Sequence, residues 1–98
     1  MNDIPAPLLK FREDIDALDQ ALIDILAKRY AVVRNVGHFK KDAQMDAVQP
    51  QRAQAVKDAA VALGVQKGMS EEFMRALYDL LIDHAHEIEH EILGDSHE

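Results

Sequence analysis

The chain has 98 residues, of which 48% are apolar, and this is enough for one domain with a small core. Its formal net charge of −7 argues against nucleic acid or an anionic membrane as the main partner. It has no cysteine, which excludes disulfides and thiolate chemistry. Residues 1–7 lack the features of a signal peptide, and no apolar run approaches the roughly 20 residues that a membrane span needs. We therefore expect a soluble, cytoplasmic protein.

A long first helix is predicted from Leu8 to about Ala43. Apolar residues recur along it in steps of four and three, which is typical of an amphipathic helix. They are Phe11, Ile15, Leu18, Leu22, Ile25, Val32, Val36 and Phe39. Arg29 fills the one gap in this pattern, and Lys40 lies roughly 20° around the helix from it. Both cations should therefore face inward, where a buried charge needs an anionic partner from the chain or from a ligand.

The length of this helix predicts a dimer. About 36 helical residues extend for roughly 54 Å, whereas a compact domain of this size has a radius of gyration near 13 Å. The rest of the chain is too short to cover such a helix along its whole length. We therefore expect an intertwined homodimer in which the long helices of two chains pack on each other.

A short second helix is predicted from Pro50, which suits a first helical turn, to about Leu63, with Gly64 as its C-cap. Its inward positions would be Val56, Ala59 and Leu63. Arg52 lies one turn before Val56 and would be a third inward cation.

A medium-length third helix is predicted to begin after Ser70, a plausible N-cap, and to stop at Gly94. Its inward seam would be Tyr78, Ile82, Ala85, Glu89 and Ile92. The sequence shows no β-pattern and no repeat. The predicted fold is therefore all-α, with three helices (long, short, medium) in an intertwined helical homodimer, and with residues 1–98 as a single domain.

Several stretches together resemble the all-helical chorismate mutases. They are Leu8–Asp19, Ala27-Lys28-Arg29, Val36-Gly37-His38-Phe39-Lys40 and Gln51-Arg52, with a polar residue at position 89. The resemblance covers nearly the whole chain. It implies a chorismate mutase type II domain that converts chorismate to prephenate in aromatic amino acid biosynthesis, the shikimate pathway, with no cofactor and no metal.

The resemblance also implies roles for individual residues. Arg12 would reach into the partner's site, whereas Arg29 would bind a substrate carboxylate within its own chain. Lys40 would bond both a carboxylate and the ether oxygen that separates during the rearrangement. Arg52 would add to the cationic lining of the site. Glu89 would bond the same ether oxygen from the opposite side.

The helix geometry and the chemistry agree with these roles. Arg12 lies about 100° around the helix from Arg29 and roughly 25 Å along it, so one helix cannot direct both at one small ligand. The rearrangement needs no nucleophile, general base or metal. A protein contributes by confining the dianion and by placing hydrogen-bond donors where negative charge grows.

Three positions depart from the usual family pattern. Family members often carry Gln where this chain has Glu89, and an ionised Glu89 cannot donate a hydrogen bond to the ether oxygen. This predicts activity that rises toward acid pH. Gln49 stands where some members have an acid that contacts a substrate hydroxyl, and Ala85 stands where some have Ser. Both are candidate substrate-binding positions at which substrate choice could differ.

A related activity is therefore an alternative. Isochorismate-pyruvate lyases of salicylate and siderophore biosynthesis share the fold and the cationic pocket. The pair Phe39-Lys40 and the twelve-residue interval from Lys40 to Arg52 resemble these lyases too. We favour the mutase over the lyase.

Two other classes are weighed against an enzyme of this family. His86-Glu87-Ile88-Glu89-His90 matches H-E-x-x-H, the helix motif of zinc proteases. Leu93 and Ser96 stand where the extended motif has Gly and His, and few residues follow that could supply a third ligand. The other class is a helical dimer that only binds a partner, in which the cations make structural ion pairs. Cations at all four family positions argue against it.

Overall fold

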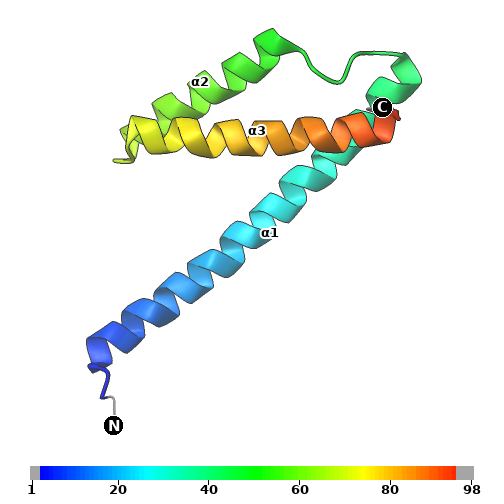
Figure 1. Cartoon of the computed structure of the whole chain (residues 1–98). Coiled ribbons are helices and arrows are strands. Elements are labelled where there is room, and N and C mark those ends of the chain that lie inside the picture. Colours follow the sequence, from blue (N-terminus) through cyan, green and yellow to red (C-terminus); the bar gives the residue numbers. More distant parts are fainter. Residues whose placement is uncertain (1–2, 95–98) are drawn as a thin grey trace. The chain divides into compact units, whose positions relative to one another are not determined.

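The computed structural model describes residues 3–94, which form three α-helices joined by two short loops (Figure 1). These are α1 (Ala6–Ala43), α2 (Pro50–Gln66) and α3 (Glu71–Leu93). The predicted all-α class, with long, short and medium helices, is confirmed for this range. None of these helices is both long enough and apolar enough to cross a membrane.

The chain divides into two compact units, the first ending at Val32 and the second beginning at Val33. The first unit contains the N-terminal part of α1, which begins two residues before the predicted start. Pro7 lies in the first turn, where its missing N–H leaves no helical bond unmade. The amides of Leu8 and Leu9 donate to the carbonyl of Pro5 and so continue the turn.

The apolar side of α1 is uncovered along its length. The eight residues of the predicted seam are between 37% and 68% exposed: Phe11, Ile15, Leu18, Leu22, Ile25, Val32, Val36 and Phe39. The amphipathic pattern is therefore present, and its apolar side chains are exposed.

In the second unit, α2 packs on α3. Val61 and Gly64 of α2 are buried, as is Met74 of α3. A Cβ atom placed on Gly64 would lie 2.5 Å from Met74 Cγ and 2.6 Å from its Sδ. Gly64 therefore allows the Met74 side chain to approach the α2 backbone closely.

Two predictions for α2 are wrong. Gly64 is not its C-cap, because the helix continues to Gln66 and the amide of Lys67 donates to the carbonyls of Leu63 and Gly64. The buried face is also rotated from the predicted one. Val56 is half-buried as predicted, but Ala59 and Leu63 are exposed, and the buried positions of α2 are Val61 and Gly64.

The predictions for α3 are confirmed. Ser70 caps the helix through its side-chain oxygen, which accepts a hydrogen bond from the amide of Phe73 at 2.9 Å. Gly94 ends the helix with φ of 77°, a left-handed conformation that glycine adopts without strain. Along the predicted seam, Ala85 and Glu89 are buried, and Tyr78, Ile82 and Ile92 are half-buried.

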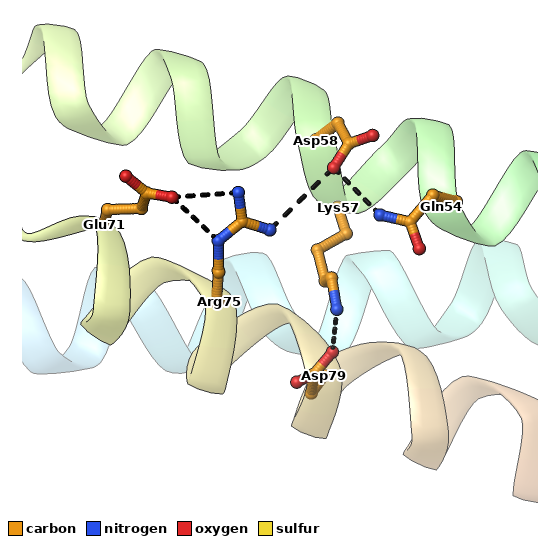
Figure 2. Close-up of polar contacts among 6 residues, drawn as sticks. All are labelled: Gln54, Lys57, Asp58, Glu71, Arg75 and Asp79. Carbon is orange, nitrogen blue, oxygen red and sulfur yellow. Dashed lines mark hydrogen bonds and ion pairs between the residues drawn. The ribbon is translucent and has the colours of Figure 1, made fainter.

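Charged side chains connect α2 and α3 on their exposed side (Figure 2). Lys57 Nζ lies 2.8 Å from Asp79 Oδ1. Arg75 bonds Glu71 on its own helix at 2.9 Å and reaches Asp58 of α2 at 4.0 Å. Because these pairs are largely open to water, we expect each to stabilise the fold by less than about 1 kcal/mol.

The close approach at Gly64 makes a testable stability prediction. Gly64→Ala should lower the free energy of unfolding by about 1–2 kcal/mol, since the strain against Met74 exceeds the gain in helix propensity. Chemical denaturation at one fixed protein concentration measures the loss. In a Met74→Ala background the same substitution should raise the free energy of unfolding by up to about 1 kcal/mol, because the side chain that it strikes is gone and the gain in helix propensity remains. Equal losses in the two backgrounds would contradict the packing role of Gly64.

Candidate functional site

Lys40 and Glu89 form a buried ion pair in the second unit. Lys40 lies near the end of α1 and Glu89 near the end of α3, and Nζ is 2.6 Å from Oε1. The two side chains are only 11% and 8% exposed. The prediction that Lys40 faces inward is therefore confirmed, and the acid that interrupts the α3 seam is its partner.

The contact between Gly37 and Ile92 explains why this pair meets. A Cβ atom on Gly37 would lie 3.0 Å from Ile92 Cδ1, so glycine allows α3 to come close to the α1 backbone here. Lys40 follows Gly37 by three residues, and Glu89 precedes Ile92 by three. Because residues three apart share a helix face, this close contact sets the two charged side chains opposite each other.

A backbone carbonyl completes the surroundings of Lys40. The loop of residues 44–49 returns over the end of α1, and Lys40 Nζ donates to the carbonyl of Ala47 at 2.6 Å. Ala47 is buried, with 3% of its surface exposed. The contribution of Ala47 could not be predicted from the sequence, because any residue supplies a backbone carbonyl.

Gln49 and Ala85 lie in the same unit as this ion pair. Ala85 is buried one turn before Glu89 on α3. Gln49 is half-buried, and its Nε2 donates to the carbonyl of Asp46 at 2.8 Å. Gln49 lines an open hollow of about 500 Å³ together with Asp46, Val48, Pro50 and Gln51. The Gln49 side chain is therefore held in one orientation beside an accessible space.

The three arginines are placed differently from Lys40. Arg52 is exposed on the first turn of α2, so the prediction that it faces inward is wrong for the described chain. The rotation of α2 that exposes Leu63 also exposes Arg52. In the first unit, Arg12 is exposed and Arg29 is half-buried, with its guanidinium carbon 5.9 Å from the centre of the Tyr30 ring. At that distance Arg29 makes a cation–π contact.

The H-E-x-x-H motif does not gather a ligand set in residues 3–94. Glu87 is exposed, and its Oε1 lies 3.0 Å from Nδ1 of His84. No group of three or more His, Asp or Glu side chains in this range is placed to hold a metal ion. Ser96, which departs from the extended motif, lies outside the described residues.

Comparison with known proteins identifies the family. The family model described as chorismate mutase type II matches residues 11–90, most of the chain. The chain belongs to the chorismate mutase type II family. The predicted resemblance is thereby confirmed, and so are its activity and its class: this chain is a chorismate mutase domain, and the reaction is an isomerisation.

Curated relatives agree with this family. The chorismate mutase domain is 32% identical over 75 residues to a 4-amino-4-deoxychorismate mutase of Streptomyces venezuelae, a match that covers 76% of this chain and 73% of the relative. It is 32% identical over 85 residues to a 4-amino-4-deoxychorismate mutase of Streptomyces pristinaespiralis, covering 87% and 66%. It is also 35% identical over 74 residues to the T-protein of Enterobacter agglomerans, covering 71% of this chain and 20% of that protein.

The buried ion pair makes a second stability prediction. Glu89→Ala should lower the free energy of unfolding by about 3 kcal/mol or more, because Lys40 would remain buried without an anionic partner. Asp79→Ala is the matched control. It removes the acid of the more exposed Lys57–Asp79 pair, whose side chains are 22% and 57% exposed, and should lower the same free energy by less than about 1 kcal/mol. Similar losses for the two variants in chemical denaturation would contradict this difference.

Proposed function

We propose that this chorismate mutase domain converts chorismate to prephenate, and that Lys40 and Glu89 act on the ether oxygen of the substrate. The observation that carries this proposal is the buried Lys40–Glu89 pair, because the structure joins the two side chains to which the family resemblance gives that role. An ammonium kept from water interacts strongly with charge that develops beside it. The support is therefore the burial of the pair together with the family.

The remaining cations would bind the two carboxylates of the substrate. Guanidinium groups suit this task because their planar forks match a carboxylate. We propose that Arg29 and Arg52 bind within one chain and that Arg12 comes from the partner. Gln49 and Ala85 would line the substrate site. Holding an extended dianion in its reactive conformer is then the main contribution of these residues.

We propose that two chains form a homodimer through the exposed apolar side of α1. Eight apolar side chains along this helix are uncovered, which is costly for a protein in water. A second copy of α1 carries the same seam and could cover it. The location in the cytoplasm and the extent of the domain over residues 1–98 stay predictions from the sequence.

A second substrate is favoured by a specific observation. Two curated relatives are named 4-amino-4-deoxychorismate mutases, and this chain carries a neutral amide at Gln49. Since one N–H of Gln49 Nε2 is bonded to the Asp46 carbonyl, the second N–H and the Oε1 acceptor are the groups that a ligand could use. A carbonyl oxygen accepts a hydrogen bond from an amino group as readily as from a hydroxyl group. The amino analogue of chorismate is therefore the alternative substrate.

The first experiment compares substrates. The purified domain should convert chorismate to prephenate, and Lys40→Ala should lower kcat/KM by about a thousandfold or more with its helicity retained. Lys57→Ala, which removes a lysine paired on the exposed side of α2, is the matched control and should leave kcat/KM unchanged within about twofold. Parallel assays on 4-amino-4-deoxychorismate and isochorismate decide the substrate. Faster turnover of either compound would replace chorismate in the proposal.

Mixing two inactive variants tests the donation of Arg12 between chains. Arg12→Ala and Lys40→Ala should each be inactive alone. After the two are unfolded and refolded together, half of the dimers should be mixed and half of their sites intact, so activity should return to about a quarter of the wild-type value. If Arg12 acts within its own chain, no mixed dimer has an intact site. Absence of recovered activity, with mixed dimers shown by mass spectrometry, would contradict donation.

The acid at position 89 makes the pH profile informative. Only protonated Glu89 can donate a hydrogen bond to the ether oxygen, so kcat should rise as the pH falls from 8 toward 5. Glu89→Gln carries a permanent donor, and its profile should be flatter and higher at neutral pH. A wild-type profile that is flat across this range would argue against the role, and so would a Glu89→Gln variant that is slower at every pH.

A further inference from the structure

We infer that Ala47 is a positioning residue for the reaction: its backbone carbonyl holds the Lys40 ammonium in place while Glu89 exchanges its bond to Lys40 for a bond to the substrate. The inference rests on the proposed function, because it concerns the same ammonium. It adds a group that the family resemblance does not supply.

The geometry around Ala47 supports a fixed anchor. Its carbonyl accepts a hydrogen bond from Lys40 Nζ at 2.6 Å, and the residue is 3% exposed. The loop that presents this carbonyl is tied to the same stretch of α1, because the amide of Met45 donates to the backbone carbonyl of Lys40 at 2.8 Å. Gln44 turns the chain there with φ of 58°. Lys40 is thus bonded to the loop through both its side chain and its backbone.

Counting donors shows why Glu89 must be released. An ammonium has three N–H donors, and in this structure Lys40 gives one to Ala47 and one to Glu89. The proposed reaction requires two more N–H donors from Lys40, one for a substrate carboxylate and one for the ether oxygen. The three N–H donors of Lys40 cannot each make a full hydrogen bond to four acceptors, namely Ala47, Glu89, the substrate carboxylate and the ether oxygen. One of the two protein acceptors must therefore leave Lys40 when the substrate binds.

Of the two acceptors, Glu89 is the one suited to leave. The Ala47 carbonyl belongs to the backbone, so it neither changes its protonation state nor rotates about side-chain bonds. The Glu89 carboxylate can rotate, and the proposed function needs it at the ether oxygen as a protonated donor, with the proton taken up from water. When it leaves, the Ala47 carbonyl still directs the ammonium, so Lys40 can offer its other two N–H groups to the ligand.

Hydrogen-bond couplings measured by NMR test this exchange directly. In the ligand-free protein, Lys40 ¹⁵Nζ should show couplings to the Ala47 carbonyl carbon and to the Glu89 carboxyl carbon. After saturation with prephenate, the coupling to Ala47 should persist and the coupling to Glu89 should be lost. Loss of the Ala47 coupling with retention of the Glu89 coupling would overturn the inference. Absence of the Ala47 coupling in the free protein would overturn it as well.

A backbone substitution tests the effect on catalysis. Replacing Val48 by its α-hydroxy acid analogue makes the Ala47 carbonyl an ester carbonyl, which is a weaker acceptor. We expect kcat to fall about five- to tenfold, with KM unchanged within about twofold. The matched control is the same amide-to-ester change between Met69 and Ser70 in the α2–α3 loop, which should leave both constants unchanged. A change in packing alone would reduce the folded fraction without changing kcat per folded molecule.

The outcomes separate this inference from the proposed function. If the wild-type protein neither converts chorismate nor binds prephenate, the proposed function has failed, and the exchange of Glu89 fails with it. If turnover is present and the ester at position 48 leaves kcat unchanged, only the inference has failed. If the ester chain does not fold, the couplings in the wild-type protein with and without prephenate still decide it.

Discussion

The ion pair between Lys40 and Glu89 is the interaction on which the rest of the site depends. It places opposite charges 2.6 Å apart in a part of the second unit that is almost closed to water. Burying two charges is unfavourable unless they have partners, and here the Ala47 carbonyl supplies a further acceptor for the ammonium. The Lys40 ammonium is therefore held in one orientation and shielded from water that would compete for its hydrogen bonds. These properties suit the binding of negative charge more than they suit stability.

Two glycines allow close contacts between helices in the second unit. Gly37 lets α3 approach α1 beside the ion pair, and Gly64 lets Met74 approach α2. Neither lies in a turn or takes a left-handed conformation, so both serve through the absence of a side chain. The charged pairs on the outside of α2 and α3 have N–O separations similar to that of the buried pair. Because they are largely open to water, they contribute little to the stability of the fold.

Much of the fold could be predicted from the sequence because the signals are local. The period of the apolar residues gave the three helices, and Ser70 and Gly94 marked the bounds of α3. The rotation of α2 could not be predicted, because Val61 and Gly64 are buried while the larger Leu63 is exposed, and the apolar period alone does not distinguish these positions. Gly64 was misread for the same reason, since glycine favours both helix ends and close contacts between helices.

In the candidate site, too, some residues could be predicted from the sequence and others could not. Glu89 interrupts the apolar seam of α3, and Lys40 lies roughly 20° around α1 from Arg29, which interrupts the other seam; both features are visible in the sequence. Arg52 was predicted to face inward only because it lies one turn before Val56. Since the buried face of α2 is rotated from the predicted one, this prediction was wrong as well. Ala47 contributes a backbone atom, which leaves no trace in residue type.

The uncovered apolar side of α1 has a consequence for how the protein behaves when it is diluted. If its burial comes only from a second copy, then the folded state and the assembled state form in one equilibrium governed by mass action. The chain's melting temperature would then climb with its own abundance, and a cell producing little of it would hold mostly inactive molecules. In that case the level of gene expression would set the fraction of chains that are folded and dimeric, as well as their total amount.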